Sequence, residues 1–179
     1  MRALVVYESM FGNTHTVADR VAAGLRTELE VTVVPATEAT HELVDAHDCL
    51  IVGGPTHAHG LSSARSRETA AETAAKEPDL ELEPDAEGAG LRDWFDGLGY
   101  GRNHRAAAFD TRVDAPAALT GRASKGINRR LVKHGFQPIV EPESFLVDKH
   151  NHLLPAEDDR AEAWGADLAH ALLAVIQHR

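Results

Sequence analysis

The stretch ALVVYESMFGNTHTVA, residues 3–18, contains the patterns of a strand, a loop and a helix in that order. Residues 3–7 are apolar and include two valines and a tyrosine, which is typical of a strand buried on both faces. Residues 8–15 then bring Ser, Gly, Asn and Thr, which form turns and helix caps. From Thr16 onward, apolar residues recur at the spacing of an amphipathic helix.

The loop in this stretch has the chemistry of a phosphate-binding site. The first backbone N–H groups of a helix have no intrahelical partner, and the positive end of the helix dipole lies beside them. The hydroxyls of Ser9, Thr14 and Thr16 add neutral donors. The side-chain amide of Asn13 adds a fourth donor, and Gly12 lets the backbone approach a ligand closely. We therefore expect an anion at the start of this helix.

Two common nucleotide-binding loops do not fit the sequence. A nucleoside triphosphatase loop needs a Lys before Ser or Thr, and no GK[ST] run occurs here. The GxGxxG pattern of dinucleotide-binding proteins is also missing. No Lys or Arg lies between Ala3 and Asp19. These observations favour a single terminal phosphate held by neutral donors.

Residues 5–18, VVYESMFGNTHTVA, resemble the phosphate-loop signature of the flavodoxin family. The apolar pair, the aromatic residue, the Ser, the small residue, the Thr and the final Ala all match positions that the signature specifies. The resemblance implies FMN as cofactor and a flavodoxin-like α/β fold: a doubly wound five-stranded parallel sheet, strand order 2-1-3-4-5, with helices on both faces. A generic strand-to-helix turn with a Ser/Thr cap is the alternative, and it does not explain the crowding of four donors.

Composition restricts the class of protein further. With 179 residues, 43% of them hydrophobic, we predict one domain over residues 1–179. The net charge of -10 argues against nucleic acid and against an anionic membrane surface as partners. No apolar run reaches membrane-spanning length and no signal-peptide core precedes the first strand, so we expect a cytoplasmic protein. Cys49 is the only cysteine, and its apolar neighbours favour core packing over a role as nucleophile.

Strand and helix patterns alternate along the rest of the chain. Further strands are expected at residues 31–34, 49–52, 105–109 and 136–140, the last continued over 144–147. Helices are expected at residues 41–46, 68–76, 91–98, 122–134 and 157–177. Residues 61–90 exceed what a minimal flavodoxin needs, so we predict an insertion between the third and fourth strands. It could roof the flavin, carry a substrate pocket or form a subunit interface, and the oligomeric state is left open.

The loop after the third strand, residues 53–60, is expected at the same sheet edge as the phosphate loop. In the family this loop contacts the flavin ring and often supplies an aromatic residue that stacks on it. Here the sequence offers His57 and His59, which can stack on the ring or hydrogen-bond its edge.

Histidines separated by one residue also suggest a metal site. A zinc or iron site needs a third Cys, His or carboxylate nearby, and the loop with His57 and His59 supplies none, so we predict no metal. The second such pair, His150 and His152, follows a strand in a polar segment. We interpret that pair as an exposed turn.

The loop after the fourth strand departs from the family. In flavodoxins this loop contacts the pyrimidine side of the flavin with backbone groups and an aromatic residue. Here the corresponding residues are Asp110, Thr111 and Arg112, and no Tyr or Trp occurs in residues 110–122. Arg112 at the flavin edge would stabilise the reduced anion. Alternatively, Arg112 pairs with a neighbouring carboxylate, that of Asp110 or Asp114, at the surface.

The resemblance implies a cofactor site made of three loops. Its residues are Ser9, Met10, Phe11, Gly12, Asn13, Thr14, Pro55, Thr56, His57, Ala58, His59, Gly60, Asp110, Thr111 and Arg112. No Ser/His/Asp, Cys/His or paired-carboxylate arrangement is present, so we predict no catalytic residue and assign the chemistry to FMN.

Three functions follow from the resemblance, in this order. The first is a flavodoxin-like FMN protein that transfers electrons between partners. The second is an FMN-dependent NAD(P)H or quinone oxidoreductase, favoured by the insertion, the His-rich loop and the missing aromatic residues. The third is a flavin-free interaction domain with the same fold. The partner is accordingly a redox protein or a small-molecule electron donor or acceptor.

Overall fold

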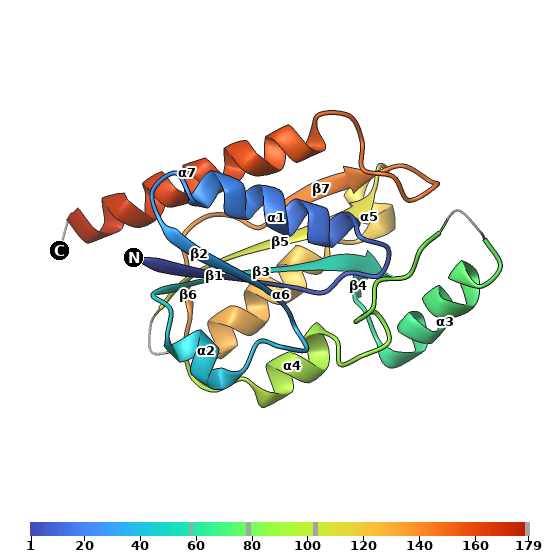
Figure 1. Ribbon diagram of the computed structural model, residues 1–179, viewed down its shortest axis with the longest axis horizontal. Helices are drawn as coiled ribbons and strands as arrows, with labels where there is room; N and C mark the ends of the chain where they lie inside the picture. Colours follow the sequence, from blue (N-terminus) through green and yellow to red (C-terminus); the bar gives the residue numbers. More distant parts are fainter. Residues whose placement is uncertain (58, 78–79, 102–103, 178–179) are drawn as a thin grey trace.

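The computed structural model describes residues 1–57, 59–77, 80–101 and 104–177 of the chain. The strands within these ranges are β1 (Arg2–Tyr7), β2 (Glu30–Pro35), β3 (Cys49–His57), β4 (Gly60–Leu61), β5 (Arg105–Val113), β6 (Gln137–Pro138) and β7 (Glu143–Val147). The helices are α1 (Asn13–Leu25), α2 (His41–Asp45), α3 (Ala64–Ala74), α4 (Leu91–Gly97), α5 (Ala117–Thr120), α6 (Ala123–Lys133) and α7 (Glu157–Gln177). Figure 1 shows them wrapped around one twisted sheet.

The sheet has the order β2-β1-β3-β5-β6, and its central pairs are parallel. In the register, Val5 lies opposite Val33 on one side and Ile51 on the other. The predicted flavodoxin-like fold is therefore confirmed, with two differences in detail. The two-residue β4 pairs antiparallel with the end of β3, so the predicted fourth strand is β5. The predicted fifth strand is divided into β6, which pairs with Arg105 and Ala106, and β7, which pairs with residues 109–113 of β5.

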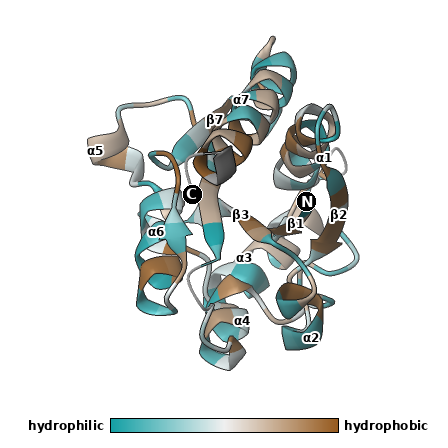
Figure 2. Ribbon diagram, turned by 90° about the vertical axis from the view of Figure 1, so that its left-hand side faces the viewer, coloured by the Kyte–Doolittle hydropathy of each residue, from teal (hydrophilic) through white to brown (hydrophobic). Residues whose placement is uncertain are grey.

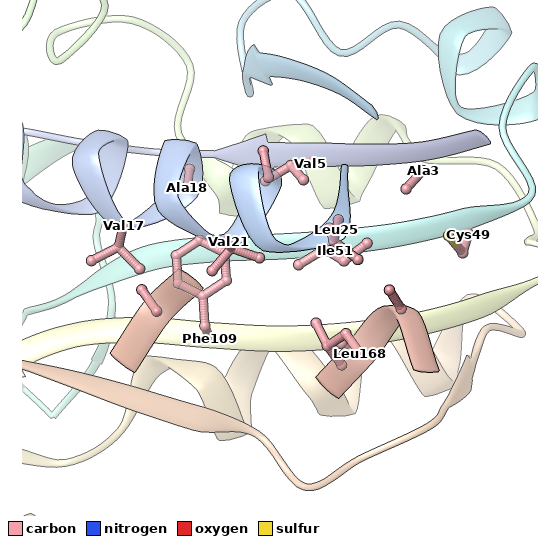
Figure 3. Packing of buried hydrophobic residues seen from close by; sticks show 14 of the residues in the cluster. Ala3, Val5, Val17, Ala18, Val21, Leu25, Cys49, Ile51, Phe109 and Leu168 are labelled. Atoms are coloured by element: carbon pink, nitrogen blue, oxygen red, sulfur yellow. The ribbon is translucent and has the colours of Figure 1, made fainter. Parts of the chain in front are cut away.

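Helices cover both faces of the sheet, as predicted (Figures 1 and 2). Alternate residues of a strand point to opposite faces, so Val5 and Ile51 pack toward α1 and α7, whereas Leu4 and Leu50 pack toward α2, α4 and α6. Figure 3 shows Val21 of α1 and Leu168 of α7 over the first of these faces. The predicted buried stripes of α6 and α7 are confirmed by buried Ile127, Leu131, Leu168 and Leu172.

Residues 61–90 emerge between β3 and β5, where the insertion was predicted. Ser63 caps α3, and its hydroxyl accepts a hydrogen bond from the N–H of Ser66. Trp94 of α4 packs against the core and donates its indole N–H to the carbonyl of Ala39, at 2.7 Å. Among the described residues, no helix is both long enough and apolar enough to cross a lipid bilayer.

Helices α1 and α7 pack at glycine contacts. A Cβ atom on Gly165 would lie 2.2 Å from the carbonyl oxygen of Val21, and one on Gly24 would lie 2.0 Å from the carbonyl oxygen of Glu162. Real Cβ atoms do not approach backbone oxygens so closely, so either side chain would push the helices apart. The two glycines therefore fix the separation of α1 from α7.

Gly165→Ala should destabilise the protein by about 1 to 3 kcal/mol, because overpacking outweighs the gain of up to about 1 kcal/mol in helix propensity. The free energy of unfolding, measured by urea denaturation, checks this. Gly97→Ala is the matched control, since a Cβ atom on Gly97 of α4 meets no atom within 4 Å. Equal stability of the Gly165 and Gly97 variants would contradict the close-packing argument.

Cys49 lies in the core, as predicted. Cys49 is part of β3 and is 2% exposed. Burial is the main cause that raises the pKa of its thiol to about 12, and the nearby Asp48 carboxylate adds to it. The reactive thiolate is therefore scarce at neutral pH.

We expect Cys49 of the native protein to react with Ellman's reagent at a rate limited by unfolding, and one thiol per chain to react at once in guanidinium chloride. The absorbance of the released thiolate measures both rates. Rapid labelling of the native protein would show that the thiol is accessible and would contradict the core assignment.

Candidate functional site

A cavity of about 200 Å³ opens where β1, β3, β5 and β7 end. Carboxyl ends of parallel strands meet at one edge of the sheet, which is where open α/β sheets bind ligands. Ten of the predicted site residues line the cavity: Ser9, Met10, Phe11, Asn13, Thr14, Pro55, Thr56, His57, Thr111 and Arg112. Three further lining residues, Val113, Val147 and Asn151, were not predicted. The cavity thus joins the three predicted loops and a fourth one.

The phosphate loop ends at Gly12, which is the N-cap of α1 and has a φ of 86°. Only glycine adopts this conformation without strain, which explains its place here. The N–H of Gly12 donates to Ser9 Oγ at 3.1 Å, and the first helical bond runs from Thr16 N–H to the Gly12 carbonyl at 2.8 Å. By helix geometry, the N–H groups of residues 13–15 have no partner within α1. They form the donor set expected for an anion.

Helix α1 begins at Asn13, earlier than the apolar pattern from Thr16 indicated. Thr16 consequently lies inside the first turn, where its side chain is exposed and does not line the cavity. The donor assigned to Thr16 from the sequence is therefore not part of the site. Gly12 shapes the loop through its backbone and likewise does not line the cavity.

Thr14 and Thr111 link α1 to β5 inside the cavity. Their Oγ1 atoms are 2.7 Å apart, and both residues are buried. Each hydroxyl carries one hydrogen, and their mutual bond uses one of the two. One hydroxyl hydrogen is therefore left to donate to a ligand.

The end of β3 supplies one wall of the cavity, because the strand continues to His57 through residues that the sequence analysis placed in a loop. Thr56 Oγ1 accepts a hydrogen bond from the N–H of Ala123 at the start of α6, at 2.9 Å, so its own hydrogen is free to donate. His57 is half-buried beside Thr56, and desolvation lowers the pKa of its imidazole although the Glu8 carboxylate opposes that shift. A neutral imidazole is thus favoured at the cavity.

Two described residues of the predicted loop, His59 and Gly60, do not line the cavity. His59 has a φ of 73° and forms a bridge to Gly121, and Gly60 pairs with His57 in the β3–β4 hairpin. The hairpin places His59 beside Gly121, in the segment before α6. The sequence could not indicate this hairpin, because β4 is only two residues long. Ala58 lies outside the described residues. Of the two histidines, His57 is the one at the cavity.

Asp110 occupies a different place from the one expected. It is fully buried and accepts a hydrogen bond from the N–H of Ser124 at 2.7 Å, so it stabilises the N-terminus of α6 instead of lining the cavity. Strand alternation explains this placement, because Thr111 points toward α1 while Asp110 points toward α6.

Arg112 lines the cavity but takes neither of the carboxylate partners considered from the sequence. Its Nη1 donates to the carbonyl oxygens of Ala115, at 2.7 Å, and Val113, at 3.3 Å. Among the described residues it forms no ion pair with Asp110 or Asp114. Its Nε is buried and has no hydrogen-bond partner within the same ranges. A cation and an unused donor therefore lie at the cavity wall.

The fourth wall is the turn after β7, residues 148–152. The Asp148 carboxylate accepts hydrogen bonds from the N–H groups of His150 and His152, both at 2.8 Å, and these bonds lower the pKa of Asp148. Both histidines are exposed, which confirms the interpretation of this segment as a polar turn. The signal that could have found Asn151 is its position after a strand that ends at the ligand edge.

A second cavity, of about 440 Å³, adjoins the first. Phe11 and His57 line both, and α3 supplies the outer wall with Arg65, Thr69 and Ala70 among others. In Figure 1, α3 lies beyond the end of β3. The insertion therefore borders the cavity that the sequence analysis assigns to the flavin.

A buried polar cluster that the sequence did not indicate ties the insertion to the phosphate loop. Glu8 accepts hydrogen bonds from the hydroxyl of Ser62 and from the N–H of Leu91, the latter at 2.7 Å. Arg67 of α3 is also buried and pairs with Asp93 of α4 at 2.9 Å. This cluster positions α3 and α4 relative to β1.

Metal binding finds no support in the described residues, where no three His, Cys, Asp or Glu side chains come together to hold an ion. The donor set instead fits FMN. Free N–H groups at the start of α1 and the hydroxyl of Thr14 suit its phosphate, and the hydroxyls of Thr111 and Thr56 suit its polar chain. The unpartnered N–H groups of Arg112 and Asn151 add donors that an anion can use.

A doubly wound α/β protein with a mononucleotide site at the sheet edge is the class that this fold and cavity define. The flavodoxin family model matches residues 5–99, and the chain belongs to the flavodoxin family. FMN is the cofactor of this family, and the chain is a flavodoxin-like FMN redox protein.

Solved structures agree on the fold. Flavodoxin 1 from Bacillus cereus has 19% sequence identity and a TM-score of 0.64, with 95% of this chain and 98% of that chain covered. A flavodoxin from the domain Archaea has 17% identity and a TM-score of 0.64, over 95% and 97% of the chains. A WrbA-like flavodoxin from Agrobacterium tumefaciens has 18% identity and a TM-score of 0.61, over 99% of each chain. No curated protein matches the sequence.

Thr14→Val should weaken FMN binding by about 1.5 to 3 kcal/mol, because it removes a hydroxyl that can donate to a charged phosphate while keeping the side-chain shape. Quenching of FMN fluorescence on titration gives the dissociation constant. Thr16→Val, an exposed change in the same helical turn, is the control and should leave it unchanged. Unaltered affinity of the Thr14 variant would refute the phosphate assignment.

Proposed function

We propose that this protein transfers electrons between redox partners through FMN bound at the sheet edge. The cofactor supplies the electron chemistry, while the protein binds it, orients it and controls access to it. The observation that carries the proposal is an apolar rim formed by two exposed side chains, Val113 at the end of β5 and Leu119 on α5. Val113 lines the cavity and is 45% exposed, and Leu119 of α5 is 68% exposed.

The rim is held in place by Arg112. Its guanidinium bonds the carbonyl of Ala115 and reaches Thr120 Oγ1 at 3.5 Å, so the segment that carries Leu119 folds back toward the end of β5. Exposed apolar side chains next to a cofactor give a partner protein a surface to desolvate at close approach. This arrangement supports electron transfer between proteins.

A second candidate is an FMN-dependent NAD(P)H or quinone oxidoreductase. The cavity of about 440 Å³ beside α3 favours it, because that cavity has the size of a small-molecule site and shares Phe11 and His57 with the cofactor cavity. A cytoplasmic location and the identity of the partner stay predictions from the sequence.

Replacing Leu119 by Asp should lower the second-order rate constant for electron transfer from the photoreduced FMN protein to a haem protein by about tenfold, because a charge replaces an apolar contact. Stopped-flow spectroscopy measures that rate. Val132→Asp, an apolar position on α6 that is also exposed, at 53%, is the matched control. Equal rate constants in the two variants would contradict the claim that the partner docks on the rim.

The same protein assayed with NAD(P)H and a quinone separates the two candidates. Steady-state turnover by the wild-type protein would favour the oxidoreductase. In that case Thr69→Trp, which fills the second cavity, should lower turnover about tenfold, whereas Glu68→Trp on the same helix should leave it unchanged. Transfer to the haem protein without such turnover would favour the carrier. Failure of the wild-type protein to bind FMN would overturn both.

A further inference from the structure

The turn after β7 lies against the start of α1. Asn13 Nδ2 donates to the backbone carbonyl oxygen of Asn151 at 2.7 Å, across 138 residues of sequence. Asn151 has a φ of 64°, a left-handed conformation that Asn tolerates better than most residues. Backbone bonds from Asn151 N–H to the Asp148 carbonyl, at 3.1 Å, and from Asp148 N–H to the His152 carbonyl, at 2.8 Å, close the turn.

The side chain of Asn151 is left with an unused donor at the cavity. Its Nδ2 is buried and forms no hydrogen bond within the described residues, and Asn151 itself lines the cavity. A buried donor without a partner costs about 1 to 3 kcal/mol, so an acceptor is expected to satisfy it. On the same side of the sheet lie the free N–H groups of α1 and the Thr14–Thr111 pair. The several oxygens of one phosphate group could accept hydrogen bonds from all of these donors.

Within the described residues, Arg112 Nε is a second buried donor at the cavity without a partner, but its guanidinium is already anchored to two carbonyl oxygens on the α5 side of β5. Asn151 instead touches Asn13, the first residue of α1. Because the phosphate is expected at that helix start, Asn151 is the better placed of the two donors.

We propose that Asn151 is a phosphate-binding residue and that the turn 148–152 forms a fourth wall of the mononucleotide site. Its side-chain amide donates to the phosphate of a flavin mononucleotide and so helps the protein select FMN over riboflavin, which lacks that group. This inference rests on the proposed FMN function. It adds a determinant from the far end of the chain to a site whose signature lies in residues 5–18.

The structure supplies a clean variant for the test. Asn151→Gly removes the amide while keeping the left-handed backbone, and the bond from Asn13 is retained because it ends on the backbone carbonyl. Asn151→Asp has nearly the same shape but replaces the donor with a negative charge. His150→Ala, an exposed side chain in the same turn, is the matched control.

The experiment measures dissociation constants of FMN and of riboflavin for the wild-type apoprotein and the three variants. We expect Asn151→Gly to weaken FMN binding on the order of 10- to 100-fold, Asn151→Asp to weaken it further, and His150→Ala to have no effect. Riboflavin binding should change less than threefold in all variants. Thermal unfolding of each apoprotein checks that the fold is intact.

Each other outcome overturns a specific claim. If Asn151→Gly leaves FMN affinity unchanged while the wild type binds FMN, Asn151 does not bind the phosphate and the proposed function stands. If riboflavin and FMN lose affinity equally, the amide contacts the shared part of the two molecules and the phosphate assignment is wrong. If the wild-type protein binds no FMN, the proposed function itself fails.

Discussion

The contact between α1 and α7 is the constraint on which the site depends. Gly24 and Gly165 place backbone against backbone, so the two helices lie closer than any side chain between them would permit. The position of α1 on the sheet decides where its first N–H groups lie, and those groups are the strongest anion-binding feature of the cavity. Packing far from the ligand thus sets the geometry of the ligand site.

The same contact explains why a turn at the far end of the chain reaches the phosphate loop. Residues 148–152 come just before α7, and α7 runs alongside α1 (Figure 1). Close packing of the helices brings this turn to the start of α1, where Asn13 bonds the carbonyl of Asn151. The last strand and the turn after it therefore complete the cavity.

Neighbouring residues at the end of β5 have different roles because alternate residues of a strand point to opposite faces of the sheet. Thr111 faces α1 and bonds Thr14, whereas Asp110 faces α6 and caps it through Ser124. Thr56 likewise accepts a hydrogen bond from the start of α6 while lining the cavity. The start of α6 is thereby fixed to the strands that carry the site, so the packing of the helical layer and the shape of the cavity are coupled.

The sequence by itself determined the strand, loop and helix of residues 3–18, because apolar runs, turn formers and amphipathic spacing are local properties. From these patterns the sheet and its ligand edge could be predicted. Only the tertiary structure decided that Asp110 lies at the start of α6, which groups Arg112 bonds, and that Asn151 lies at the cavity. Each of them depends on contacts between elements distant in sequence, such as β5 with α6 or α1 with the turn before α7, and no local pattern encodes those distances.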